Sequence, residues 1–284
     1  MFKKLIGSFL VSSLLLGVTS NVYADEAYTL NNADDVYDRV VDLKLFNIEE
    51  NGELEFLGNK EDLNVNPNIY NEFLDKISSI NFLVDKGIAH VENDFEVKVA
   101  TPEEITEIAY SEGNGNLVDI NDNSNVSPFN YKNNTYNRNK SITPYAVDPG
   151  LPKINLTSLV VANRKELKTL YESLLRTSPT GAYPAAVGYF VGKVREKGPW
   201  DYKIQPGYKY WYKEWQATTY AGTKIINSEY IGNYNYSYVG ELLFSKTVLL
   251  KAGAAIGKGV GQKEDAKDKD AITLGYNDAV KYGK

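Results

Sequence analysis

A short motif in the last third of the chain combines residue types that carry out acid–base chemistry. Residues 198–203 read Gly-Pro-Trp-Asp-Tyr-Lys. Asp201 and Lys203 share a face if this segment is extended, because alternate side chains of a strand point the same way. A carboxylate beside an ammonium group can orient a substrate or stabilise a developing anion. We predict Asp201 as a base or orienting carboxylate and Lys203 as an electrostatic stabiliser; a surface turn with an ion pair is the alternative.

A second motif places asparagines and tyrosines between two glycines over residues 231–240. Asparagine amides hydrogen-bond to substrates or to backbone, and aromatic rings stack on sugars or bases. We predict that Asn233 positions a substrate, while ordinary helix packing is the alternative for the whole stretch. The predicted substrate-binding side chains are aromatic: Trp200, Tyr234 and Tyr236.

A third group of candidates is acidic and lies near the C-terminus. Asp265, Asp268 and Asp270 alternate with lysines, but they lack the residue order of a calcium-binding loop. A solvated charge run explains most of them. Asp270 precedes a predicted helix over 271–282, where its carboxylate suits the helix dipole and could point into a cleft. We therefore predict Asp270 as a second catalytic carboxylate.

The absence of cysteine and the single histidine, His90, exclude several kinds of site. Thiolate nucleophiles, cysteine-ligated zinc, iron–sulfur clusters and histidine pairs are ruled out. His90 lies in a strand-like segment away from the motifs, and we predict a half-buried, structural side chain. We predict no metal site, and the sequence identifies no cofactor. Acid–base work therefore falls to Asp, Glu, Lys or Tyr.

The first 24 residues have the pattern of a secretory signal peptide. Lys3 and Lys4 precede an apolar run of about a dozen residues, shorter than the roughly 20 that span a bilayer. Residues 22–24 have the small and apolar groups of a cleavage site. We predict that the processed chain begins at Asp25 and that the protein is secreted and extracellular.

Charge divides the remaining chain into two parts. Residues 25–150 contain 9 Lys and Arg against 25 Asp and Glu, a net charge of −16. Residues 151–284 contain 20 against 12, a net charge of +8. Opposite charge indicates modules that have different partners or face each other, whereas two ordinary solvated surfaces are the alternative. An intramolecular contact in which the acidic module masks the basic one is one hypothesis.

Residues 25–110 are predicted to form a small α+β module. Asn51-Gly52 predicts a hairpin, and Pro67 begins a helical pattern that Gly87 ends. Residues 88–91 and 95–99 read as a second strand pair. Thr101, Pro102 and Glu104 form the signature of a capping box at the start of another helix.

Two further regions complete the predicted α+β architecture. Residues 111–150 are rich in asparagine and proline without periodicity, which indicates a disordered linker. Residues 151–284 are predicted to be mainly helical with one short hairpin. The expected helices cover 156–175, 182–196, about 238–256 and 271–282.

The order of the three motifs resembles a known family. The motif at 198–203, then Gly232-Asn233 with Tyr236 and Gly240, then Asp268 and Asp270-Ala271-Ile272 with Gly275, is similar to the bacterial polymorphic toxin type 44 domain. The resemblance covers about 180–284. It implies a secreted or delivered toxin, and a toxin of this kind implies an immunity protein as a possible partner.

We therefore expect a secreted toxin whose basic C-terminal domain is a hydrolase of a polymer. Nucleic acid suits the charge of +8, and a cell-wall glycan suits paired carboxylates and tyrosine stacking. The alternative is a non-enzymatic protein that binds a surface or perturbs membranes through the apolar segment 242–256.

Overall fold

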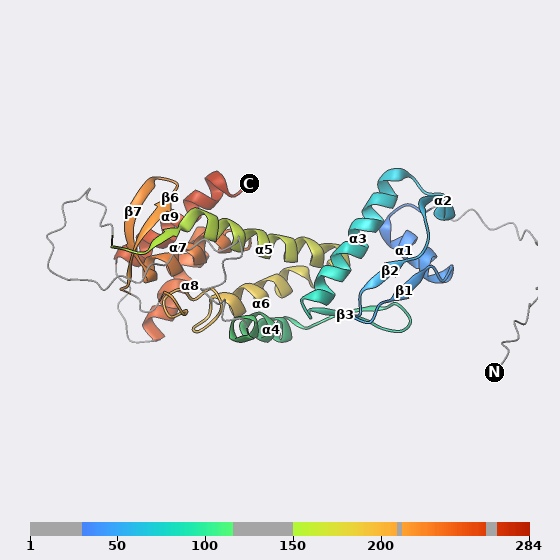
Figure 1. The fold of residues 1–284 in the computed structure, drawn as a ribbon, viewed down its shortest axis with the longest axis horizontal. Coiled ribbons are helices and arrows are strands. Elements are labelled where there is room, and N and C mark those ends of the chain that lie inside the picture. Colours follow the sequence, from blue (N-terminus) through green and yellow to red (C-terminus); the bar gives the residue numbers. More distant parts are fainter. Residues whose placement is uncertain (1–29, 116–149, 209–211, 260–265) are drawn as a thin grey trace, which may run out of the picture.

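The computed structural model describes residues 30–115, 150–208, 212–259 and 266–284. They form a mixed α+β protein in which helices dominate and the sheets are small (Figure 1), so the predicted fold class is confirmed. The predicted signal peptide, 1–24, lies outside the described residues, as does nearly all of the predicted linker.

The N-terminal part contains two antiparallel hairpins among helices, as predicted. Gly52 adopts a φ of +86° in the first hairpin turn, a conformation that glycine reaches without strain. His90 is exposed rather than half-buried, because strand alternation buries Ala89 and turns His90 outward. The elements are α1 (Ala33–Asp42), β1 (Phe46–Ile48), β2 (Leu54–Phe56), α2 (Lys60–Leu63), α3 (Pro67–Asp85), β3 (Ala89–Val91), β4 (Val97–Val99) and α4 (Pro102–Gly115).

Helix α3 begins and ends where the sequence predicts. The Asn66 side chain accepts the Asn68 N–H at 2.8 Å, and Pro67 occupies the first turn. At the other end Gly87 has a φ of +65°, and the Ile88 N–H donates to the carbonyl of Leu83 at 2.8 Å. This closure turns the chain sharply into β3.

Helix α4 begins at the predicted capping box but continues beyond the predicted module. The Thr101 N–H donates to the Glu104 carboxylate at 2.8 Å, and the Glu104 N–H donates to the Thr101 hydroxyl at 3.3 Å. The helix then runs to Gly115, so the start of the linker at residue 111 was predicted too early. Packing explains the difference: Ile105 and Ala109 are fully buried against the C-terminal part.

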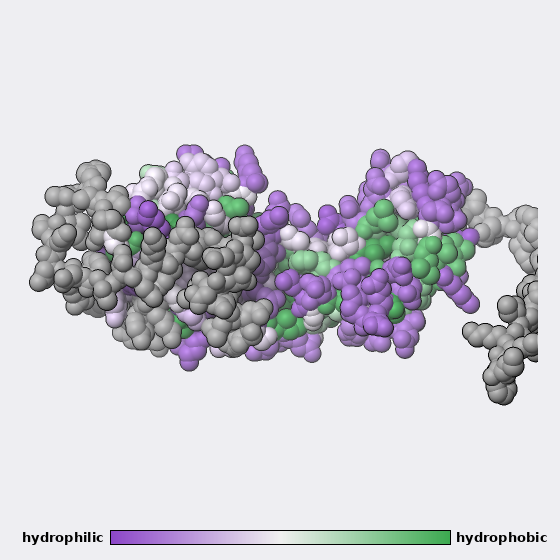
Figure 2. Space-filling model, in the orientation of Figure 1, coloured by the Kyte–Doolittle hydropathy of each residue, from purple (hydrophilic) through white to green (hydrophobic). Residues whose placement is uncertain are grey.

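Two hydrophobic cores divide the chain within α3 rather than at residue 110. The smaller core joins α1, the first hairpin and most of α3, and includes Phe46 and Phe73. The larger core continues from Leu83 through β3 and α4 into the C-terminal part. Apolar residues gather on the N-terminal part in the face shown in Figure 2. Helix α4 therefore packs with the C-terminal part although it precedes the predicted linker.

The C-terminal part combines a three-stranded sheet with five helices among its described residues. Strand β5 pairs in parallel with β6, which pairs antiparallel with β7 in the predicted hairpin. The elements are β5 (Lys153–Asn155), α5 (Leu156–Thr177), α6 (Ala182–Val194), β6 (Glu214–Thr219), β7 (Gly222–Asn227), α7 (Ser228–Gly240), α8 (Lys246–Gly259) and α9 (Ala266–Tyr282).

Two helix starts differ from prediction. Helix α7 begins at Ser228 rather than near 238, because the Asn227 side chain caps it and accepts the Tyr230 N–H at 2.8 Å. Ile231, Tyr234 and Tyr238 then recur on one buried face. Helix α9 likewise begins at Ala266 rather than 271. Among the residues described, no helix has the length and apolar character needed to cross a membrane.

Candidate functional site

A pocket of about 390 Å³ opens where the β6–β7 hairpin meets the first turns of α7 and α9. Tyr230 lines it together with charged side chains. The carboxylates that line the pocket outnumber the lysine ammonium groups that line it. The lining is therefore acidic, although residues 151–284 as a whole have a net positive charge. The charged lining residues are Glu214, Glu229, Asp268 and Asp270, with Lys224 and Lys267.

A hydrogen bond joins the second and third sequence motifs at this pocket. The Asn233 amide nitrogen donates to the Asp268 carboxylate at 2.6 Å. Asn233 lies on α7 and Asp268 on the first turn of α9, and the two helices pack closely along Gly275. The predicted catalytic residue Asp270 lines the pocket two residues further on. The positions of Asn233 and Asp270 therefore fit one site.

The first motif contacts α7 next to Asn233 through Lys203. A Cβ at Gly232 would lie 3.4 Å from Cγ of Lys203, so the lysine chain lies directly on the glycine next to Asn233. Neither Lys203 nor Asn233 lines the pocket. All three motifs thus meet around Gly232 and Asn233.

Asp201 lies apart from the pocket. Residues 202–204 form a turn, so the expectation that an extended segment places Asp201 and Lys203 on one face is wrong. Asp201 is 8% exposed and accepts the Lys197 N–H at 3.0 Å. Burial raises the pKa of Asp201, although the backbone of Lys197 and the charge of Lys203 oppose this. Its geometry suits a residue that organises the turn presenting Lys203.

Asp201→Asn is expected to change how stability depends on pH. Because burial raises the pKa in the folded state, the native protein binds this proton more tightly than the unfolded chain. Asp201 therefore contributes most to the free energy of unfolding at low pH. This contribution falls as the pH rises through the raised pKa that Asp201 has in the folded protein. The variant should match wild type in acid and exceed its unfolding free energy at neutral pH. Denaturant unfolding of both proteins at several pH values measures this difference. The prediction is contradicted if the stability of the variant relative to wild type is lower at neutral pH than in acid.

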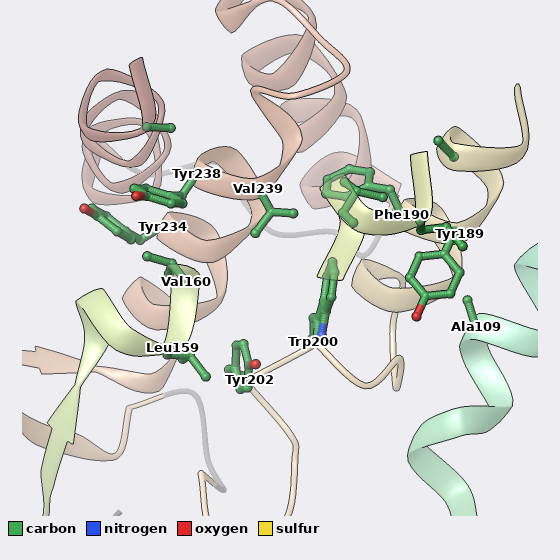
Figure 3. Close-up of a cluster of buried hydrophobic side chains, with 14 of the residues drawn as sticks. Ala109, Leu159, Val160, Tyr189, Phe190, Trp200, Tyr202, Tyr234, Tyr238 and Val239 are labelled. Carbon is green, nitrogen blue, oxygen red and sulfur yellow. The ribbon is translucent and has the colours of Figure 1, made fainter. Parts of the chain in front are cut away.

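The predicted aromatic binding residues lie mostly in the core (Figure 3). Trp200 is 5% and Tyr234 is 1% exposed, so neither presents a free ring face. The Tyr234 hydroxyl donates to Asp278 at 2.6 Å, and the half-buried Tyr236 ring packs 5.7 Å from that of Phe190. These contacts favour the packing alternative stated above for this stretch.

Tyr230 is an aromatic pocket residue that the sequence analysis did not single out. Burial, together with the charges of Asp278 and Asp270, raises its pKa to about 12. Its hydroxyl is therefore neutral near pH 7 and can donate a hydrogen bond. Spacing offered one signal: Tyr230, Tyr234 and Tyr238 recur every four residues and their rings stack at 5.9 and 6.1 Å.

Two pocket carboxylates, Glu214 and Glu229, were missed because each stands alone in sequence, and Asp268 was named only as part of a charge run and of the third motif. A buried amide network fixes the elements behind them. The Asn163 amide nitrogen on α5 donates to the Tyr202 hydroxyl and to the Asn235 amide oxygen, both at 2.8 Å. It ties the 198–203 loop to α7.

Comparison with known proteins assigns this chain to no family. No family model, curated protein or solved structure matches the chain. The resemblance to polymorphic toxin type 44 thus stays a prediction. Within the described parts of the chain, no group of three or more His, Asp or Glu is arranged to hold a metal ion.

Proposed function

We propose that this protein is a secreted toxin whose C-terminal part hydrolyses a cell-wall glycan. The acidic pocket is the observation that carries the proposal. Glycoside hydrolysis commonly needs one carboxylic acid to protonate the leaving oxygen and one carboxylate as nucleophile or base. Four carboxylates around an open pocket supply such a pair, and a neutral glycan meets no charge repulsion there.

Individual side chains have complementary roles in this proposal. Asp268 is oriented by Asn233 and stands in the first turn of α9, where the helix dipole favours a negative charge. Asp270 is exposed at the pocket and provides a second carboxylate. The neutral Tyr230 hydroxyl offers a donor to a sugar hydroxyl, and Lys203, which lies on Gly232 next to Asn233, supplies a positive charge.

Nucleic acid is the second candidate substrate, favoured by a different observation. Lys224 and Lys267 line the same pocket, and residues 151–284 have a net charge of +8. Lysines that neutralise phosphates would make binding fall steeply with salt concentration. Glycan cleavage should depend much less on salt.

The test uses the chain from Asp25 onward, purified and incubated with peptidoglycan, RNA or duplex DNA. We expect new reducing ends from peptidoglycan and no shortening of either nucleic acid. Salt-sensitive cleavage of RNA or DNA alone would replace the glycan by the second candidate. No cleavage of any polymer, combined with dye leakage from liposomes, would favour the non-enzymatic alternative.

Growth assays locate the target independently. The same chain is expressed in a bacterial cytoplasm, or exported to the periplasm behind an added leader. A glycan hydrolase should stop growth only from the periplasm, where its substrate lies. Toxicity only in the cytoplasm would contradict the glycan proposal.

A further inference from the structure

We propose that Glu112, in the acidic N-terminal part, positions the 198–203 loop of the candidate site through Lys193. The N-terminal part contacts the C-terminal part where α4 packs along α6 (Figure 1). A Cβ at Gly188 or Gly192 would come closer than 3.0 Å to the backbone oxygens of Pro102 and Thr106. The two helices are therefore in backbone-to-backbone contact, and α4 is fixed rather than loosely apposed.

Lys193 is enclosed by this contact and is only 4% exposed. Its ammonium group pairs with Glu112 of α4 and, at 2.9 Å, with Glu166 of α5. The Tyr189 hydroxyl contacts the same two carboxylates, at 3.2 Å and 2.7 Å. A cation this buried needs its partners, because an unpaired charge is strongly disfavoured away from water.

Lys193 also holds the start of the loop. Its carbonyl accepts the Trp200 N–H at 2.8 Å, and its ammonium group lies 5.5 Å from the centre of the Trp200 ring. Gly198 fits against the carbonyls of Lys193 and Gly192 so closely that a Cβ would lie under 3.0 Å from them. Lys193 thus pairs with Glu112 of α4 through its side chain and binds the start of the 198–203 loop through its carbonyl.

The loop then leads to α7, where Lys203 lies on Gly232 beside Asn233, the residue that hydrogen-bonds to Asp268 of the pocket. None of the pocket-lining residues belongs to residues 30–115. The α4–α6 contact therefore lies outside the pocket lining and bears on the site only through the 198–203 loop. Glu112 is a positioning residue, and its catalytic consequence rests on the proposed function.

Glu112→Gln tests the inference, with Glu107→Gln as the matched control. Glu107 pairs at 3.0 Å with Arg195, the residue that follows α6, whereas Glu112 pairs with Lys193. Amide hydrogen exchange is measured on the intact chain, and thermal unfolding reports any global loss. We expect Glu112→Gln to speed exchange at the Trp200 and Asp201 amides about tenfold over the control, since partly buried ion pairs restrain local opening.

The catalytic readout is the split between kcat and KM on the cleaved polymer. We expect Glu112→Gln to lower kcat with KM nearly unchanged, because Lys203 is misplaced while the pocket stays open. Equal exchange at Trp200 and Asp201 in the two variants would overturn the inference. Faster exchange in Glu112→Gln, together with a wild-type protein that cleaves no polymer, would uphold the positioning contact and overturn the proposed function.

Discussion

Asp268→Asn is expected to lower turnover of the polymer by about 10²- to 10⁴-fold, the range that a general acid or base contributes. The substitution removes the charge that α9 presents to the pocket. It keeps the shape, and its amide oxygen can still accept the hydrogen bond from Asn233. Stability should therefore change little while chemistry is lost. Steady-state kinetics and thermal unfolding of the same preparation measure both quantities.

Asp278→Asn is the matched control, because it removes an aspartate charge from the same helix at a position that does not line the pocket. Asp278 accepts the hydroxyl of the buried Tyr234 at 2.6 Å. Losing this charge-assisted bond should reduce the free energy of unfolding by about 1–2 kcal/mol. Its turnover should stay near that of wild type. Full turnover in Asp268→Asn would remove Asp268 from the catalytic machinery.

Gly275→Ala is expected to destabilise the folded protein by about 1–3 kcal/mol, the usual cost of overpacking a dense contact. A Cβ on Gly275 would come closer than 3.0 Å to the Ser237 hydroxyl and the Tyr234 carbonyl of α7. A backbone oxygen inside a helix cannot rotate away, so α7 and α9 must separate. This separation should also weaken the Asn233–Asp268 hydrogen bond.

The measurement is the melting temperature, which should fall by several degrees in a protein of this size. Asn277→Ala serves as the control, since residue 277 is exposed on the same helix and alanine favours helix formation. The control should melt close to wild type. A Gly275→Ala variant as stable as Asn277→Ala would show that the α7–α9 contact has more freedom than its geometry indicates.

Local signals in the sequence were sufficient to predict several elements. Pro67 and Gly87 mark the two ends of α3, Thr101 and Glu104 begin α4, and a glycine turn at 52 makes the first hairpin. Each depends on hydrogen bonds or backbone angles within a few residues, so neighbouring residues suffice. The sequence also offered Lys203, Asn233 and Asp270 as candidates from residue type and order, and of these Asp270 lines the pocket.

Other features depended on contacts that no local pattern contains. Trp200 and Tyr234 resembled binding residues, yet tertiary packing buries both. Helix α4 looked like the end of an acidic module, yet its apolar face completes the C-terminal core. Helix propensity and amino-acid composition predict burial poorly where a segment packs against residues that are distant in sequence.

What the sequence by itself determined is the α+β class, the capped helix starts of the N-terminal part, the lack of cysteine and the residue types available for acid–base chemistry. Only the tertiary structure decided which carboxylates share a pocket, that Asp201 organises a turn, and that α4 supports the 198–203 loop. The physical reason is distance along the chain. Asn233 and Asp268 are 35 residues apart, and only the close packing of α7 on α9 brings their side chains within hydrogen-bonding reach.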